Sequence, residues 1–333
     1  MSSLKQENAV CVAGVNLVRR WHCSFLSKEK SGMYHATNAS VLDGGYTGLR
    51  GAKRVLAHRY ASNAILKAIE QMRISLEQED YNLDSVALCC GMDRYQTSRM
   101  FRKITGVSPI KFLFALRMDA AKRLLAESDR SVTDICLDVG YSGLGTFISR
   151  FKAAVGLPPA EYRQRRRSTG TNLPALIDCM VRLRAEPVSG LRGRLALPEA
   201  FSGIVFLGVF DTGLPEGAPS ICTVVTQTLD FTISPSMPVD ARIFAVAVPW
   251  KNLDQTINDP SQALRASMSC RTFLDGGNGR TLLLDIPGPY HPPILTSLPI
   301  LIDKMLHSAT VRLPPAASLE ALRMETPHHE DAR

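Results

Sequence analysis

The chain has 333 residues, 45% of them hydrophobic and 21% charged, as is ordinary for a globular protein that folds in water. This length allows two domains with a packed core in each. No apolar run approaches the roughly 18 residues that a membrane-spanning helix needs. The short apolar patch near the N-terminus also lacks a small-residue cleavage site. We therefore expect a cytoplasmic protein with no signal peptide and no membrane partner.

The eight cysteines do not have the spacing of a metal site. Cys11 and Cys23 lack the paired short spacings of zinc ligands, and Cys89, Cys90 and Cys136 fall inside apolar helical patterns. We expect buried thiols in a reducing compartment, with no metal and no cofactor. A redox sensor built on the adjacent Cys89 and Cys90 is the alternative.

The positive charge is concentrated in the middle of the chain. The whole chain has a net charge of +8, and residues 53–167 alone hold 20 basic and 12 acidic residues. Residues 1–52 have a small basic excess, whereas residues 168–333 have a net charge of −3. Binding to a polyanion is therefore expected in the middle segment, although a solvated basic surface would give the same count.

The first 53 residues show no sustained hydrophobic period, so we expect residues 1–53 to form a flexible N-terminal arm. A start codon assigned too early would explain the same composition. From about Arg54 to Gln78 the pattern becomes helical, because Ile65, Ile69 and Met72 recur at helical spacing between charged residues.

Residues 82–109 have the pattern of two short helices joined by a tight turn, and a long amphipathic helix follows from Pro109 to Ser128. Residues suited to helix ends occur at each boundary. The expected N-caps are Asn82, Asp93 and Ser108, and the expected C-terminal glycines are Gly91 and Gly106.

The same arrangement returns about fifty residues later, in "DICLDVGYSGLGTFISRFKAAVGLPPAEYRQ" (residues 134–164). Ser131 and Asp134 form a capping-box pattern at its start. We interpret the similarity as duplication of one helical unit, with a turn one residue longer in the second copy. Chance similarity between helices is the alternative. Gly91 corresponds to Gly140 at an offset of 49 residues, and Phe101 to Phe151, Gly106 to Gly156 and Pro109 to Pro159 at an offset of 50.

Both copies have what a helix-turn-helix requires, which is a small residue where the helices cross and a glycine four positions later. The small residues are Ala87 and Cys136. The second helix of the first copy has an inner apolar stripe and a polar outer face that suits the DNA major groove. The inner stripe is Thr97, Met100, Phe101 and Ile104, and the outer face is Tyr95, Gln96, Ser98, Arg99, Arg102 and Lys103.

The helix between the two copies has a length that matches DNA. Its 20 residues, Pro109 to Ser128, span about 30 Å at ~1.5 Å per residue. One turn of DNA separates successive major-groove faces by ~34 Å. One rigid helix can therefore hold two DNA-reading helices about one turn apart in a single chain.

Residues 82–164 resemble the DNA-binding domain of the AraC/XylS family of bacterial transcription regulators. The signature lies in "DICLDVGY" and "FISRFKAAVGLPPAEYR", placed after a first helix-turn-helix. With the helix from Arg54, the resemblance covers about a third of the chain, and we assign residues 54–167 to this domain. It implies seven helices that bind double-stranded promoter DNA, regulate transcription and usually touch RNA polymerase.

The second reading helix departs from the family pattern. Many members carry an Arg at the position of Ser149, where it commonly reaches a base, and the internal repeat likewise sets Arg99 opposite Ser149. We therefore expect the first copy to supply most base readout and the second to anchor mainly to the DNA backbone. Ile148 either touches a thymine methyl or packs inward. The expected DNA contacts of this helix are Gly145, Thr146, Ser149, Arg150 and Lys152.

The segment "YRQRRR", from Tyr162 to Arg167, ends the basic region. Arg163 and Arg165 are expected to add phosphate contacts and salt dependence, and a solvated helix end is the alternative. We expect residues 168–190 to form a linker to a second domain.

Beyond the linker the composition changes to β-branched runs separated by Pro and Gly turns, which favours strands. The expected fold class is therefore multidomain, with an all-α double helix-turn-helix DNA-binding domain followed by a mainly β sandwich-like domain over residues 191–312 and a flexible tail over 313–333. This part faintly resembles transthyretin-like or carboxypeptidase-regulatory-like sandwiches. The expected strands are Arg192–Leu197, Gly203–Phe210, Ile221–Ile233, Ala241–Val248 and one in "RTLLLDI", with a closing helix in "PPILTSLPILIDKMLH".

No catalytic constellation stands out in this second part. Its carboxylates Asp211, Glu216, Asp230 and Asp285 are scattered near turns, and His291 beside two prolines is expected to be structural. The leading interpretation is a sequence-specific transcription regulator that is not an enzyme. Its second domain would bind a small-molecule effector or mediate homo-oligomerisation.

Two alternatives belong to other classes of protein. One is an architectural DNA-binding protein without regulatory output. The other is a DNA-repair methyltransferase-type fusion, since some of those enzymes carry the same kind of helix-turn-helix domain. The sequence lacks the Pro-Cys-His-Arg motif and the four-cysteine zinc site that such an enzyme needs.

Overall fold

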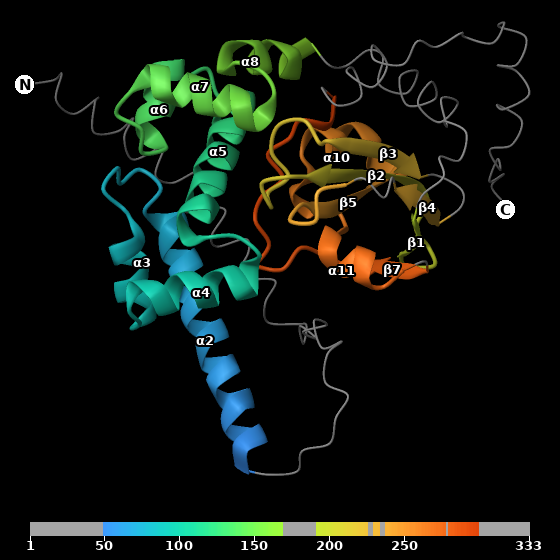
Figure 1. The fold of residues 1–333 in the computed structure, drawn as a ribbon. Coiled ribbons are helices and arrows are strands. Elements are labelled where there is room, and N and C mark those ends of the chain that lie inside the picture. The colour runs from blue at the N-terminus through green and yellow to red at the C-terminus, as the bar shows by residue number, and fades with distance from the viewer. Residues whose placement is uncertain (1–48, 169–190, 226–228, 234–236, 278, 300–333) are drawn as a thin grey trace, which may run out of the picture.

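The computed structural model describes residues 49–168 and 191–299, apart from residues 226–228, 234–236 and 278. A helical region comes first in the chain and a sheet-rich region follows it (Figure 1). This order is the one that the sequence predicts. The expected linker and C-terminal tail, and most of the expected N-terminal arm, lie outside the described residues.

Seven helices make up the helical region, and α5 separates the group α3–α4 from the group α6–α8 (Figure 1). The first helix begins at Leu49, a few residues before the expected start at Arg54. The helices are α2 Leu49–Ile74, α3 Leu83–Cys90, α4 Arg94–Thr105, α5 Pro109–Glu127, α6 Val132–Asp138, α7 Leu144–Val155 and α8 Pro159–Ser168.

Apart from α2, which ends at Ile74 and not at Gln78, the helix ends lie close to where the sequence predicts. Asn82 caps α3 by accepting a hydrogen bond from the backbone N–H of Asp84 at 2.8 Å, and Asp93 and Ser108 cap α4 and α5 in the same way. A glycine in the left-handed conformation directly follows each of α3, α4 and α7, and another lies in the turn after α6. Their φ angles are 62° for Gly91, 84° for Gly106, 75° for Gly140 and 101° for Gly156.

The two helix pairs, α3–α4 and α6–α7, repeat one another in the length of their second helix and in their core. The second helix has 12 residues in each pair. Phe101 and its counterpart Phe151 are both fully buried, and Phe101 meets Phe112 of α5 edge to face with ring centroids 5.4 Å apart. Both pairs therefore pack against α5 through one continuous hydrophobic cluster.

The sheet-rich region holds two sheets. In the three-stranded sheet the order is β4-β1-β7, with β1 antiparallel to β4 and parallel to β7. In the four-stranded sheet the order is β3-β2-β5-β6, and all neighbours are antiparallel. The strands are β1 Leu191–Ala196, β2 Gly203–Phe210, β3 Ile221–Val225, β4 Asp230–Ile233, β5 Arg242–Pro249, β6 Arg265–Ser269 and β7 Arg280–Leu283.

The four-stranded sheet is covered on both faces. Val205, Leu207 and their neighbours share a hydrophobic cluster with side chains of the three-stranded sheet. On the opposite face, Ile204 and Phe206 pack in a second cluster that includes Ile257 of the helix α10 (Leu253–Asn258). Because both faces are buried, β2 is a continuous apolar run rather than an alternating one.

Some elements differ from the sequence prediction. The run Ile221–Ile233, expected as one strand, forms β3 and β4 in different sheets, and no Gly or Pro between Val225 and Asp230 signals the break. The predicted closing helix over residues 292–307 is wrong for residues 292–297, which are not helical; residues 298 and 299 are helical, and the rest of the segment lies outside the described residues. Several short elements were not expected, because segments of three to six residues show no clear period: η1 Trp250–Asn252, α10, η2 Pro260–Gln262, β6 and the helix α11 Cys270–Asp275.

The sheet-rich region packs beside α5 (Figure 1). The ammonium of Lys111 donates to the backbone carbonyl of Thr212 at 3.2 Å, and the ammonium of Lys122 donates to that of Ile294 at 2.9 Å. Leu214 and Leu295 of the sheet-rich region are fully buried in the hydrophobic cluster of the helical region. The two regions therefore share part of one core.

The C-terminal ends of α4 and α7 both meet the sheet-rich region. At α7, the backbone N–H groups of Gly217 and Ser297 donate to the carbonyls of Ala154 and Val155 at 2.6 and 3.3 Å, so they satisfy carbonyls that a helix end leaves unpaired. At α4, the guanidinium of Arg242 lies against Gly106, where a Cβ would sit 3.2 Å from Nη1. A cation at this place also complements the negative end of the helix dipole.

Candidate nucleic-acid interface

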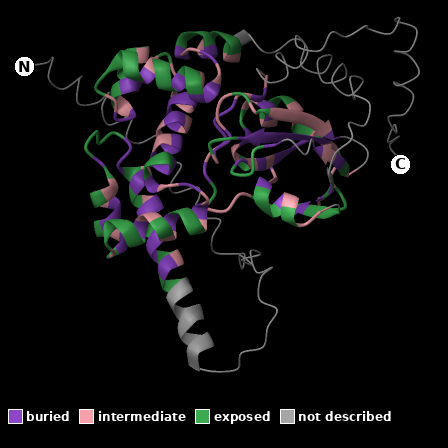
Figure 2. Ribbon diagram, viewed as in Figure 1, coloured by how far each residue is buried: buried purple, intermediate pink, exposed green. Residues whose placement is uncertain are grey.

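The outer face of α4 is polar and exposed, whereas its inner face is buried (Figure 2). Thr97 and Phe101 are completely buried, and Met100 and Ile104 are partly buried against the same core, so the predicted inner stripe is confirmed. Of the predicted DNA contacts, Ser98 is half-buried and the others are exposed: Tyr95, Gln96, Arg99, Arg102 and Lys103.

Two contacts organise the exposed face of α4. The guanidinium carbon of Arg99 lies 5.5 Å from the centroid of the Tyr95 ring, which is within the range of a cation–π contact. Arg94, at the start of α4, pairs with Asp84 of α3, and this hydrogen bond holds the pKa of the Asp84 carboxyl below its usual value. Arg99 is thus positioned by its own helix, while Arg94 ties the two helices together.

The corresponding face of α7 carries fewer base-reading side chains. Ile148 is half-buried and packs against the helical core, which favours packing over contact with a thymine methyl. Arg150 is exposed but hydrogen-bonds to the side chain of Tyr141. The other predicted contacts are exposed on this face: Gly145, Thr146, Ser149 and Lys152.

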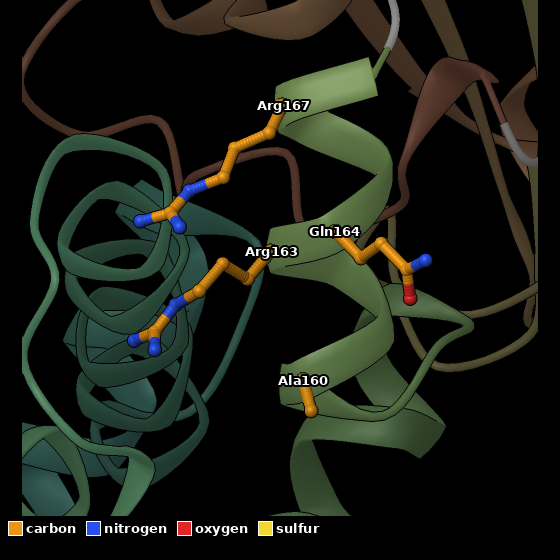
Figure 3. Close-up of a pocket in the computed structure, with 4 residues that line it drawn as sticks. All are labelled: Ala160, Arg163, Gln164 and Arg167. Atoms are coloured by element: carbon orange, nitrogen blue, oxygen red, sulfur yellow. The ribbon is translucent and has the colours of Figure 1, made fainter.

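The basic cluster on α8 is partly tied to the segment between α5 and α6. Arg163 is half-buried and its Nη2 donates to the carbonyl of Arg130, while Arg167 pairs with Asp129. Figure 3 shows Arg163 and Arg167 pointing to one side of α8 and Gln164 to the other, around an open hollow of about 390 Å³. Arg165 is exposed, 3.6 Å from Glu161 one turn earlier. These arginines stabilise the helix as well as adding positive charge.

Two basic residues of α5 have structural roles that the sequence pattern did not reveal. Arg117 donates from Nε to the carbonyl of Leu76 at 3.1 Å and lies 5.9 Å from the ring centroid of Tyr141. Lys122 is buried, and burial lowers the pKa of its ammonium. In the sequence, the only sign of these roles was that Arg117 and Lys122 are charged residues on the inward side of an amphipathic helix.

The described residues hold no group of three His, Cys, Asp or Glu side chains that could bind a metal ion. Burial raises the pKa of the Cys90 thiol to about 11 and also raises that of Cys89. Because a thiolate is the reactive form, these shifts count against a redox sensor at this position. No helix in the described part of the chain is both long enough and apolar enough to span a membrane.

Two helix pairs with tight glycine turns and an exposed basic second helix define the helical region as a helix-turn-helix DNA-binding region. Comparison with known proteins agrees: residues 86–165 match the family described as "Helix-turn-helix domain". The helical region thus matches a helix-turn-helix family and resembles the DNA-binding domain of AraC-type regulators, as its sequence predicted.

Curated relatives match over a similar length. The bifunctional transcriptional activator/DNA repair enzyme AdaA of Bacillus subtilis is 34% identical over 86 residues, which is 26% of this chain and 41% of that protein. The RCS-specific HTH-type transcriptional activator RclR of Escherichia coli is 28% identical over 100 residues, which is 30% of this chain and 35% of that protein. The chain thus spans less than half the length of these relatives.

A solved structure of a transcriptional regulator with an AraC-type DNA-binding domain, from Chromobacterium violaceum, is 28% identical and has a TM-score of 0.31. The aligned part covers 33% of this chain and 96% of the chain of the solved structure.

Proposed function

We propose that this protein is a sequence-specific transcription regulator that binds double-stranded promoter DNA. Both helix pairs act as helix-turn-helix motifs, and α4 and α7 enter successive major grooves. The observation that carries this proposal is the placement of the two pairs on α5, whose 19 residues span about 28 Å at ~1.5 Å per residue. That length approaches the ~34 Å between major-groove faces one turn apart.

The two helices divide the work of recognition. Gln96 and Arg99 on α4 are side chains that hydrogen-bond to adenine and guanine edges. On α7, Ser149 stands in place of Arg99 and Ile148 packs inward, so this helix contributes mainly contacts to phosphates through Lys152. Arg163 and Arg165 of α8 add positive charge for contacts to phosphates.

The remaining parts of the proposal concern partners of the whole chain. The protein works in the cytoplasm, contacts RNA polymerase when it activates a promoter, and uses the sheet-rich region for an effector or for self-association. Many of the relatives are named as transcriptional regulators. The match to AdaA, which is also named as a DNA-repair enzyme, covers only 26% of this chain and supports no enzymatic role here.

Selection of bound genomic fragments by the full-length protein, repeated over a salt titration, tests this function. We expect one shared motif with two half-sites separated by about one turn of DNA, ~10 base pairs. A motif with one half-site would contradict the use of both helices. Uniform binding that depends only on salt would instead indicate an architectural DNA-binding protein.

A further inference from the structure

A small pocket lies where the sheet-rich region meets the end of α4. Its volume is about 30 Å³, which suits a few water molecules or the head group of a small ligand. Two arginines of adjacent strands line it, Arg242 from β5 and Arg265 from β6. Phe244 and Ser267, which are opposite each other in the strand register, lie between them. The remaining walls are Thr105, Gly213, Pro215, Ala266, His291, Pro292 and Ile294.

The positive charge of this pocket lacks a matching negative charge. Arg242 donates from Nη2 to the hydroxyl of Ser267 at 3.2 Å, and Arg265 donates from Nη1 to the carbonyl of Pro292 at 3.3 Å. The Nε of Arg265 is buried and has no hydrogen-bond partner within the described part of the chain. No Asp or Glu is among the described residues that line the pocket.

The acidic groups that act electrostatically on the pocket residues lie outside the pocket walls and have other contacts. Asp119 of α5 attracts Arg265 but lies 3.4 Å from Arg123. Asp285 acts on His291, and its carboxylate accepts the backbone N–H of Ile286 at 2.7 Å. Neither carboxylate fills the space between the two arginines.

The titration of the pocket residues agrees with this geometry. Burial lowers the pKa of Arg265 to about 10 and also lowers that of Arg242, so both stay charged at neutral pH although their charged forms are disfavoured. Burial and these two arginines lower the pKa of His291, whose Nδ1 accepts the backbone N–H of Gly288 at 2.9 Å. An anion in the pocket would supply the negative charge that neither guanidinium group finds in the pocket walls.

We propose that this pocket binds a small oxyanion, the carboxylate or phosphate group of a small molecule, between Arg242 and Arg265. The guanidinium group presents several N–H donors in a planar fork that fits two oxygens of such a group. The unpaired Nε of Arg265 supplies one donor, and the Ser267 hydroxyl can supply another. The volume accommodates only the anionic group, so the rest of a larger ligand would extend outside.

The position of this site links it to the DNA-binding region. Thr105, the last residue of α4, forms part of the wall, and Arg242 touches Gly106 directly after it. An oxyanion would therefore bind where the sheet-rich region holds the C-terminal end of the helix that we assign to base readout. This regulatory consequence rests on the proposed function, whereas the binding of the oxyanion does not.

Thermal unfolding of the full-length protein tests the site without DNA. Inorganic phosphate, sulfate and acetate are added separately at low millimolar concentration, with chloride holding the ionic strength constant. We expect at least one of them to raise the Tm in proportion to the logarithm of its concentration above its Kd, by about 3 °C at tenfold its Kd. The anion that raises the Tm most identifies the preferred anionic group. Absence of a rise in Tm with all three anions would overturn the proposal.

Three variants and a matched control locate the effect. Arg242→Gln and Arg265→Gln should each abolish the rise in Tm, while Arg194→Gln, which removes an exposed arginine of β1, should retain it. Ser267→Asp places a carboxylate beside Arg242. It should therefore leave the Tm unchanged or higher without ligand and remove any further rise.

Because Ser267→Asp supplies its own negative charge, it keeps the test informative if an arginine variant fails to fold. A rise that persists in Ser267→Asp or in Arg265→Gln would overturn the proposal. Failure of the protein to bind a specific operator would leave this result unaffected.

Discussion

The Cα of Gly140, in the turn between α6 and α7, faces the backbone carbonyl of Leu76 with no space for a side chain between them. A Cβ on Gly140 would also lie 2.7 Å from the guanidinium of Arg117. Gly91 has the same position in the first helix pair and a similar φ, yet among the described residues no atom beyond its chain neighbours lies within 4 Å of its Cβ position. The duplicated turn is therefore packed in one copy and open in the other.

This difference predicts unequal effects of one substitution on stability. Gly91→Ala should lower the free energy of unfolding by about 1–2 kcal/mol, because it forces alanine into the left-handed region. Gly140→Ala should cost about 1–3 kcal/mol more, since overpacking is added to the same strain. Chemical denaturation of both variants measures the difference. If both variants lose the same free energy of unfolding, the backbone near Leu76 can shift to accommodate the added methyl group at no cost.

The structure also predicts which arginine reads DNA. Arg99→Ala should weaken binding to the selected operator by about 1–3 kcal/mol and relax specificity at one base position. Ser149→Ala should have a smaller effect, because Ser149 lacks a comparable side chain. Titration of labelled operator at fixed salt measures both, with Arg271→Ala, an exposed arginine of the sheet-rich region, as the control. A larger loss from Ser149→Ala would reverse the assignment of the two helices.

Lys152 should contribute to affinity without contributing to specificity. It is exposed on α7, and we expect it to contact a phosphate. Lys152→Ala should weaken binding to all sequences to a similar degree and reduce the slope of log K against log salt by about 1. Lys251→Ala, which removes an exposed lysine of the sheet-rich region, should leave that slope unchanged. A sequence-dependent loss would mean that Lys152 reads a base.

The buried ammonium of Lys122 should make stability depend on pH in the alkaline range. Burial lowers its folded-state pKa below the usual 10.5, so between these values the unfolded chain binds more protons than the folded protein. The free energy of unfolding of the wild type should therefore rise relative to Lys122→Met as pH increases towards 10.5, by at most ~1.4 kcal/mol per pH unit.

Denaturation curves of the wild type and Lys122→Met at several pH values measure this difference. Lys251→Met, which removes an exposed lysine, is the matched control. Parallel stability curves for the wild type and Lys122→Met would show that Lys122 titrates normally.

The helical region was largely predictable from the sequence because its signals are local. N-caps at Asn82, Asp93 and Ser108 each satisfy backbone groups within a few residues of themselves. The inner stripe of α4 follows from helical periodicity, and the left-handed glycines at Gly91 and Gly106 follow from the need to end a helix. Each of these features depends only on neighbours in the sequence.

The features that were missed depend on contacts between distant segments. Nothing near Arg242 in the sequence shows that it lies against Gly106, and nothing near Lys122 shows that it donates to Ile294. The break between β3 and β4 lacks a local signal as well. The role of each exposed residue in DNA binding also remains a prediction, because exposure shows which side chains can reach a ligand and not which ones bind.

The burial of Leu214 and Leu295 in the helical core has a consequence for experiments on separate fragments. A fragment that ends at Ser168 would leave two apolar hollows open to water, and the last carbonyls of α7 would lose the N–H groups of Gly217 and Ser297. Such a fragment should unfold at lower temperature than the whole chain. The helical region thus completes its hydrophobic core with side chains that belong to the sheet-rich region.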